Sequence, residues 1–149
     1  MIYDKAASKG PQADIEAIAE IERILIDARC AADAMPHTAD DIVRYTFITP
    51  TQFVGLDAVR NYYDHQFNSI ADIESSFVTL PVIVADGSLA IAYCLQQYRW
   101  TNPDGSPYVC VFRVTDNLRK EAGGWKVFHS HISSPMNPAT GQIEMSLVQ

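Results

Sequence analysis

Two histidines near the end of the chain, His129 and His131, are the side chains best suited to moving protons. They stand in the segment Trp125-Lys126-Val127-Phe128-His129-Ser130-His131. A strand here places Trp125, Val127 and both histidines on one face, because strand side chains alternate with period two. Imidazole is the side chain whose unperturbed pKa lies near neutrality, so a half-buried pair is a candidate general acid–base device. The alternative is structural: one histidine hydrogen-bonds across the sheet and the other lies at a dimer surface.

Asp116 is the acid that a hairpin brings closest to these histidines. In one of the two registers that the Gly-Gly turn allows, the final hairpin pairs Lys120 with Trp125. In that register Asp116 faces His129, at the separation of about 5 Å between opposed Cβ atoms that lets a carboxylate orient an imidazole. A one-residue slip instead puts Asn117 opposite His129 and turns Asp116 to the other face. The sequence leaves both registers open.

Tyrosines are the second chemical resource of the sequence. A phenol in a dry pocket donates a hydrogen bond to an oxyanion or acts as a general acid. We predict that Tyr45 acts with His131 to position the substrate. Tyr63 and Tyr93 are predicted to contact the substrate, since both fall in predicted helix or sheet.

Arg113 and Trp125 are further candidates for contact with the substrate. Arg113 stands in the middle of a predicted strand and needs a partner if it is buried. That partner is either an anionic substrate or an internal salt bridge. Trp125 is either a ligand platform or a core residue.

Two helices are predicted in the first half of the chain. Apolar residues at three- and four-residue steps, with either Ile21 or Glu22 in the stripe, predict a helix over 14–34. A short turn or helix over 38–41 leads into a strand over 42–49, which Pro50 closes. A second helix is predicted over 57–70, opened by Gly55.

The second half of the sequence is typical of a meander. Two Asp-Gly pairs and one Gly-Gly pair separate β-rich runs, which is a strong hairpin signal. The predicted strands cover 75–80, 82–85, 89–101, 108–120 and 125–132, and 143–148 could add an edge strand. Helices followed by antiparallel strands define an α+β fold. The helices cover the concave side of a strongly bent sheet and enclose a conical pocket for a small ligand.

Composition and charge narrow the class of protein. The 149 residues predict one domain over 14–135, with a flexible arm over 1–13 and a tail over 136–149. A net charge of -7 argues against nucleic acid or an anionic membrane as partner. No apolar run approaches the ~20 residues of a membrane span, and no signal peptide is recognisable, so we expect a cytoplasmic protein. Three cysteines without CxxC spacing indicate reduced thiols, and we expect neither metal nor cofactor.

The sequence resembles the nuclear transport factor 2-like superfamily, in its SnoaL-like or ketosteroid isomerase-like branch. The motifs lie in residues 14–135: Asp40-Asp41-Ile42-Val43, Phe53-Val54-Gly55-Leu56-Asp57-Ala58-Val59-Arg60, Asp104-Gly105, Arg113-Val114-Thr115 and Gly124-Trp125-Lys126-Val127-Phe128-His129-Ser130-His131-Ile132-Ser133. The resemblance implies a cone-shaped fold, usually cofactor-free and often dimeric. It implies no single reaction, because the superfamily includes isomerases, hydrolases, cyclases, lyases and non-enzymatic binders.

The resemblance to the steroid isomerase also places two positions. Its general-base aspartate falls near Thr46, which cannot accept a proton with that strength and is retained only as a substrate contact. Its neutral carboxylic acid, which donates to the oxyanion, falls near Asp116.

These observations predict a cofactor-independent acid–base enzyme of the isomerase, cyclase or C–C lyase type. Its substrate is a hydrophobic aromatic or polycyclic molecule, and it forms a homodimer. His129 is the predicted proton-transfer residue and Asp116 its orienter or a neutral oxyanion donor. The alternative is a non-catalytic ligand-binding or assembly module on the same fold. The Asp-Arg-Asp triad usual for epoxide hydrolysis on this fold is not evident in the sequence.

Overall fold

Three helical segments precede most of the strands in the computed structural model, which describes residues 1–70 and 72–144. The helical segments are α1 (Gln12–Asp27), α2 (Ala31–Ala34) and the short 3₁₀ helix η1 (Met35–His37), and α3 (Leu56–Ser69) follows two strands later. The strands are β1 (Thr38–Tyr45), β2 (Phe53–Val54), β3 (Glu74–Phe77), β4 (Val82–Asp86), β5 (Leu89–Thr101), β6 (Pro107–Glu121) and β7 (Gly124–Ser133).

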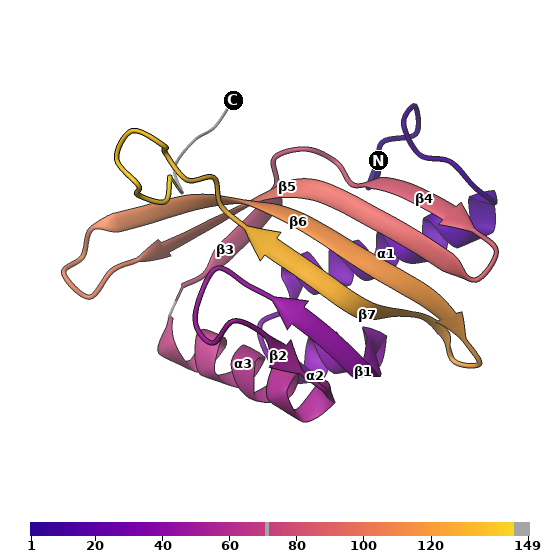
Figure 1. Ribbon diagram of the computed structural model, residues 1–149, viewed down its shortest axis with the longest axis horizontal. Coiled ribbons are helices and arrows are strands. Elements are labelled where there is room, and N and C mark those ends of the chain that lie inside the picture. The colour runs from indigo at the N-terminus through magenta and orange to yellow at the C-terminus, as the bar shows by residue number, and fades with distance from the viewer. Residues whose placement is uncertain (71, 145–149) are drawn as a thin grey trace.

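One strongly curled, unclosed sheet organises the molecule, with the order β2-β1-β7-β6-β5-β3 and β4 paired to β5. Neighbouring strands are antiparallel except β1 and β7, which run parallel. The helices gather on one side of the sheet, α1 along the long strands and α3 beside β1 and β2 (Figure 1). The predicted α+β cone is confirmed.

The N-terminal helical region differs from the single helix expected over 14–34. Its first part, α1, ends at Asp27 and the chain turns before α2 begins at Ala31. The Asp33 carboxylate causes this break, because it accepts the backbone N–H of Arg29 at 2.9 Å and of Cys30 at 3.3 Å. These bonds cap a new helix instead of continuing the old one.

The first strand is displaced towards the N-terminus relative to the expected 42–49. It begins at Thr38 and ends at Tyr45, where its pairing with β7 ends opposite His131. Beyond it, the Thr46 hydroxyl accepts the backbone N–H of Ile48 at 3.2 Å, a local turn that competes with strand pairing. The segment expected to be a turn or helix over 38–41 is therefore strand.

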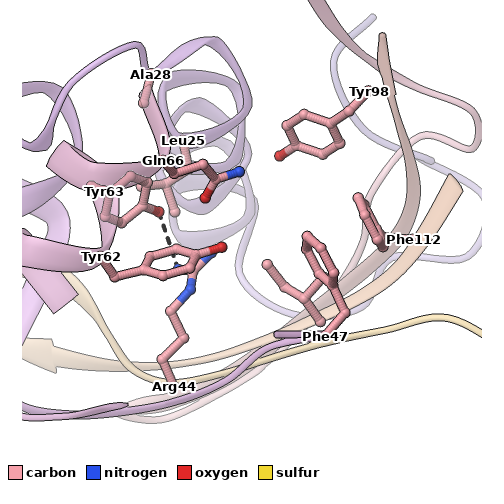
Figure 2. A pocket seen from close by; sticks show the side chains of 10 residues that line it. Leu25, Ala28, Arg44, Phe47, Tyr62, Tyr63, Gln66, Tyr98 and Phe112 are labelled. Carbon is pink, nitrogen blue, oxygen red and sulfur yellow. Dashed lines mark hydrogen bonds between the residues drawn. The ribbon is translucent and has the colours of Figure 1, made fainter. Parts of the chain in front are cut away.

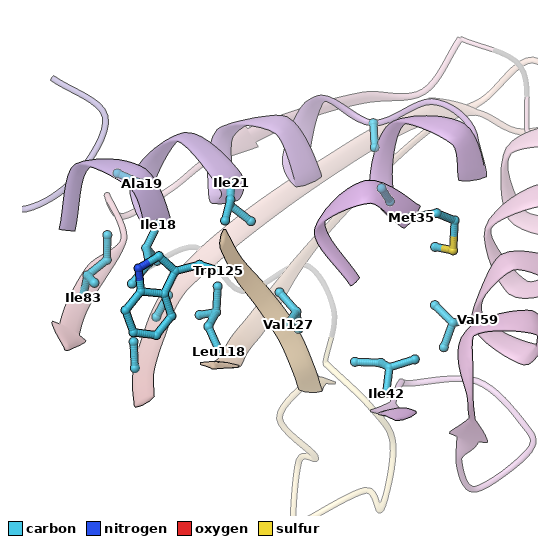
Figure 3. Packing of buried hydrophobic residues seen from close by; sticks show 14 of the residues in the cluster. Ile18, Ala19, Ile21, Met35, Ile42, Val59, Ile83, Leu118, Trp125 and Val127 are labelled. Atoms are coloured by element: carbon cyan, nitrogen blue, oxygen red, sulfur yellow. The ribbon is translucent and has the colours of Figure 1, made fainter. Parts of the chain in front are cut away.

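The core lies between α1 and the inner face of the sheet. Ile18, Leu118 and Val127 are among the apolar side chains that meet there, and Ile18 and Leu118 are fully buried (Figure 3). Trp125 is also in this core, and its indole Nε1 donates to Asp14 Oδ1 at 3.0 Å. Of the two roles considered for Trp125, the structure shows the core role.

A β-bulge at Phe128 resets the register of the final hairpin. Lys120 pairs with Trp125, but Asn117 pairs with His129 because Phe128 has no partner on β6. Before the bulge, odd-numbered residues such as Trp125 and Val127 face inwards. After it, even-numbered residues such as Ser130 face inwards. The expectation that Trp125, Val127, His129 and His131 share one face is therefore wrong, and Asp116 does not face His129.

The segments before and after the predicted domain also make contacts. The first residues, expected to be a flexible arm, lie against β4. Tyr3 is buried, and Lys9 forms an isolated parallel β-bridge with Val84. In the tail, Met136 forms an isolated antiparallel β-bridge with Ile143. Most of the edge strand predicted over 143–148 lies outside the described residues. None of the helices in residues 1–70 and 72–144 has the length and apolar character to cross a membrane.

Candidate functional site

Three polar side chains form a row across the inner face of the sheet. Asp116 of β6 pairs with Ser130 of β7, and Ser130 pairs in turn with Arg44 of β1. The bulge at Phe128 produces this row, because it brings Ser130 to the inner face in place of His129. An acid, a hydroxyl and a guanidinium therefore stand in sequence across three strands.

Asp116 is a buried acid with an unsatisfied oxygen. Only 5% of the residue is exposed, and its Oδ1 makes no hydrogen bond within the described part of the chain. Burial raises the pKa of Asp116, while a hydrogen bond from Ser130 and the charges of Arg44 and His129 act in the opposite direction. Because its pKa is raised, this carboxyl is better suited than an exposed aspartate to exchange a proton near neutral pH.

Glu22 of α1 is a second buried acid on the same side of the sheet. The residue is 1% exposed, and its Oε1 also lacks a hydrogen-bond partner among the described residues. Burial, and then the charge of Asp116, raise the pKa of Glu22 well above its usual range. The two carboxyls interact, and of the two only Asp116 has a hydrogen-bond donor, Ser130, and a nearby guanidinium that oppose the effect of burial on its pKa.

Two adjoining pockets open beside the Arg44 end of this row. The inner pocket, of about 30 Å³, is lined by Leu25, Ala28, Arg44, Phe47, Tyr62, Tyr63, Gln66, Tyr98, Phe112 and Ile132. The outer pocket, of about 220 Å³, is lined by Phe47, Ile48, Tyr62, His65, Gln66, Ser69, Ile70, Tyr98, Trp100 and Phe112. Five lining residues are common to both pockets, so they form one cavity with a polar end and an aromatic end.

The aromatic walls of the cavity come from the sheet and from α3. Figure 2 shows Arg44, Tyr62 and Tyr63 on one side and Tyr98 and Phe112 on the other. Phe47 stacks on Phe112 with ring centroids 4.2 Å apart and an interplanar angle of 20°. Such surfaces suit a flat, unsaturated ligand.

The phenols of the cavity are neutral hydrogen-bonding groups. Tyr98 donates its hydroxyl proton to Gln96 Oε1 at 3.0 Å, and burial raises the pKa of Tyr98. The Tyr63 hydroxyl accepts Arg44 Nη1 at 3.1 Å, and burial raises the pKa of Tyr63 although the guanidinium opposes it. Of the residues predicted to contact substrate, Tyr63 is the one that lines the cavity.

His129, His131 and Tyr45 form a separate cluster on the outer face of the sheet. The ring centroid of Tyr45 lies 4.9 Å from that of His129 and 5.8 Å from that of His131. The side-chain amide Nδ2 of Asn117 lies 3.1 Å from His129 Nδ1. The structure therefore brings these three predicted residues together, but on the opposite side of the sheet from Asp116.

Three other predicted contact residues lie away from the cavity. Tyr93 is 47% exposed and pairs with Thr115, whose other neighbour is the outer-face His131. Arg113 is exposed on the same strand, and Thr46 lies just after β1. Expecting Tyr93 and Arg113 in the cavity is wrong, because residues with odd numbers in this part of β6 and their partners on β5 face outwards.

Sequence reasoning missed Arg44 and Glu22. Arg44 interrupts the apolar run Ile42-Val43-Arg44-Tyr45, and Glu22 falls at a three- or four-residue step from Ile18 and Leu25. Charged residues at buried positions of an amphipathic pattern are the signal that could have identified both. Among residues 1–70 and 72–144, no three His, Cys, Asp or Glu side chains are arranged to hold a metal ion.

The chain belongs to the family of SnoaL-like domains, whose model matches residues 19–137. This is the branch of the NTF2-like superfamily that the sequence resembles, so the family prediction is confirmed. A comparison with curated proteins gave no match.

Solved structures share the fold at low sequence identity. An NTF2-like protein of unknown function from Pseudomonas putida KT2440 is 23% identical, with a TM-score of 0.80, covering 92% of this chain and 96% of that one. An NTF2-like superfamily protein from Salmonella enterica serovar Typhimurium is 15% identical, with a TM-score of 0.77 and coverage of 89% and 98%. A ketosteroid isomerase-like protein from Erwinia carotovora atroseptica SCRI1043 is 18% identical, with a TM-score of 0.69 and coverage of 84% and 100%.

Proposed function

We propose that this protein is a cofactor-independent enzyme that transfers a proton to or from a hydrophobic aromatic molecule bound in the cavity. The reaction class is isomerisation, cyclisation or C–C lyase cleavage. The observation that carries the proposal is a pair of buried acids, Asp116 and Glu22, each with an unsatisfied oxygen. Burying acids without full hydrogen bonding costs free energy, so a fold retains them where they serve chemistry.

Asp116 is the group we assign to proton transfer. It accepts a hydrogen bond from Ser130, and it shares a row with Arg44, whose charge favours its ionised form. Ionised Asp116 takes the proton from the substrate and, once neutral, returns it at another atom. Burial and the charge of Asp116 raise the pKa of Glu22, so the site disfavours a second negative charge.

The remaining cavity residues bind and orient the substrate. The stacked Phe47 and Phe112 rings supply a flat apolar surface. The similar fold of the ketosteroid isomerase-like protein from Erwinia supports this class of chemistry.

The catalytic roles expected for His129, His131 and Tyr45 stay predictions. Their place on the outer face, among exposed side chains such as Tyr93, favours the alternative role at a surface between two copies of the chain. A homodimer and a cytoplasmic location are likewise part of this proposal.

The second candidate function is a binding module without catalysis. The observation that favours it is the place of Asp116, which lies in the row behind Arg44 and is not among the residues that line either pocket. In that case the two acids have no catalytic role and affect only the electrostatic environment of the Arg44 guanidinium.

A thermal-shift screen followed by mass spectrometry separates the two functions. The panel contains aromatic alcohols and ketones, diaryl lignin-type compounds, steroids and polyketide-like quinones. Saturation at about 100 times the dissociation constant stabilises the fold by about 2.7 kcal/mol, a shift of several degrees. Conversion of a hit by the wild type and not by Asp116→Asn supports the enzyme. Hits that bind without conversion support the binding module.

A further inference from the structure

Arg44 places a permanent positive charge at the polar end of the cavity. Its Nη1 donates to Tyr63, but its Nε is buried and makes no hydrogen bond among the described residues. The guanidinium carbon lies 5.2 Å from the centre of the Tyr62 ring and 5.0 Å from that of Tyr63. The head group is thus held by two aromatic rings and one phenol, and part of its donor capacity is unused.

No acid of the described chain neutralises this charge at ion-pair distance. The ion pairs in residues 1–70 and 72–144 involve Arg23, Arg119 and Lys120, and none involves Arg44. The nearest acid in the row is Asp116, on the far side of Ser130. An enclosed guanidinium without a bound anion is costly, and a ligand that brings the anion removes that cost.

The shape of the cavity indicates what kind of anion fits. The inner pocket beside Arg44 has about 30 Å³, which is room for a small polar group only. The outer pocket has about 220 Å³ and aromatic walls. Since an apolar cavity of about 150 Å³ holds benzene, the outer pocket suits a ligand with one ring or a short conjugated arm.

We propose that the cavity binds an aromatic carboxylate, with its carboxylate against Arg44 and its ring between the Phe47–Phe112 stack and the tyrosines. A guanidinium presents its N–H groups in a planar fork that matches the two oxygens of a carboxylate. The same fork is less well matched to a neutral carbonyl, so the charge of the ligand decides its affinity. This inference deepens the proposed function and rests on it for the site, because it names the substrate class of the same cavity.

The test compares charged probes with neutral probes of the same shape. Benzoate and cinnamate are titrated against benzamide and cinnamamide by isothermal titration calorimetry, at one pH and one ionic strength. The proteins are the wild type, Arg44→Met and Arg113→Met. Arg113 is exposed on the outer face and is the matched control for removing an arginine. Arg44→Lys, which keeps the charge but not the fork, is the second variant if Arg44→Met does not fold.

The carboxylates are expected to bind the wild type and Arg113→Met alike. They should bind Arg44→Met about ten- to a hundredfold more weakly, the loss expected for a charge-assisted hydrogen bond, with Arg44→Lys in between. The amides should bind the wild type more weakly than the carboxylates by a similar factor. Equal binding of amides and carboxylates by the wild type overturns the inference, and so does full carboxylate affinity in Arg44→Met or, in its place, Arg44→Lys.

Binding and turnover fail separately in this design. Carboxylates that bind through Arg44 but are never converted leave the inference intact and count against the proposed enzyme. A neutral aromatic compound that is bound and converted, with carboxylates rejected, overturns the inference and leaves the enzyme intact.

Discussion

Asp116 and Arg44 lie in one row of inward-facing side chains, two strands apart, with Ser130 between them. Each carries an atom that is buried and unpaired in the described structure, Oδ1 of the acid and Nε of the guanidinium. The two side chains therefore do not hydrogen-bond to each other, but they are close enough for the charge of each to affect the pKa of the other. A ligand that enters between the aromatic walls meets the fixed positive charge of Arg44, and Asp116 lies beyond it in the same row.

Replacing Asp116 by Asn should remove turnover without unfolding the protein. Loss of a general acid–base group typically costs about 10²- to 10⁴-fold in rate, whereas the amide fills the same space. The measurement is initial rate on a converted hit, with a thermal melt to verify folding. His129→Gln is the matched control, since His129 lies on the neighbouring strand but on the outer face. Equal loss in both variants would restore the catalytic role predicted for His129.

Replacing Glu22 by Gln should stabilise the protein, and more so at higher pH. Because burial raises the pKa of Glu22, the folded state keeps a proton that the unfolded state loses above pH 4.5. Wild-type stability therefore falls as pH rises between these two pKa values, by about 1.4 kcal/mol per pH unit for one proton. Glu22→Gln lacks this slope.

Urea unfolding from pH 4 to pH 8 measures the effect of Glu22→Gln, with about 1 kcal/mol as a detectable difference. Glu16→Gln, on the exposed face of the same helix, serves as the control. A difference between wild type and Glu22→Gln that is constant across this pH range would contradict a raised pKa for the glutamate.

Truncating Leu118 should destabilise the fold strongly. The residue is fully buried between α1 and the sheet, so Leu118→Ala leaves a cavity and should cost about 2–5 kcal/mol. Leu80→Ala is the comparison, because Leu80 is 39% exposed. Urea midpoints for the two variants give the answer, and similar midpoints would place Leu118 outside the cooperative core.

A charge on the outer face should separate the proposed dimer. Leu89, Ile91 and Tyr93 of β5 are 56%, 45% and 47% exposed, and they form an apolar surface opposite to the helices. Ile91→Asp should convert a dimer into a monomer, because an interface cannot bury an unpaired carboxylate without a large cost. Light scattering after size-exclusion chromatography reads the mass directly. A monomeric wild type at the highest soluble concentration would refute the dimer.

The sequence identified the fold because its patterns are local and redundant. Turn signals at Asp86-Gly87, Asp104-Gly105 and Gly123-Gly124 define the hairpins, and the span of β5 matches the expected 89–101. The boundaries that moved, at Asp27 and at Thr38, depend on a side-chain cap and on pairing between strands far apart in sequence. Such interactions produce no periodic pattern in the amino-acid sequence.

The candidate site was harder to identify because one bulge decides it. Alternation predicts that His129 shares a face with Val127, and a single extra residue, Phe128, reverses that for every position after it. Tyr63, a predicted substrate contact, lines the cavity, but Asp116 does not face the histidine that it is predicted to orient, and Arg44 is not among the predicted residues. A charged residue in an apolar strand was the available signal.

Proton transfer at Asp116 is tested most directly by deuterium incorporation. Compounds selected for binding are incubated with the protein in D₂O and examined by mass spectrometry for exchange at carbon. The account predicts exchange with the wild type and with His129→Gln, and none above background with Asp116→Asn. Exchange that persists in Asp116→Asn, or binding without any exchange or conversion in the wild type, would contradict it.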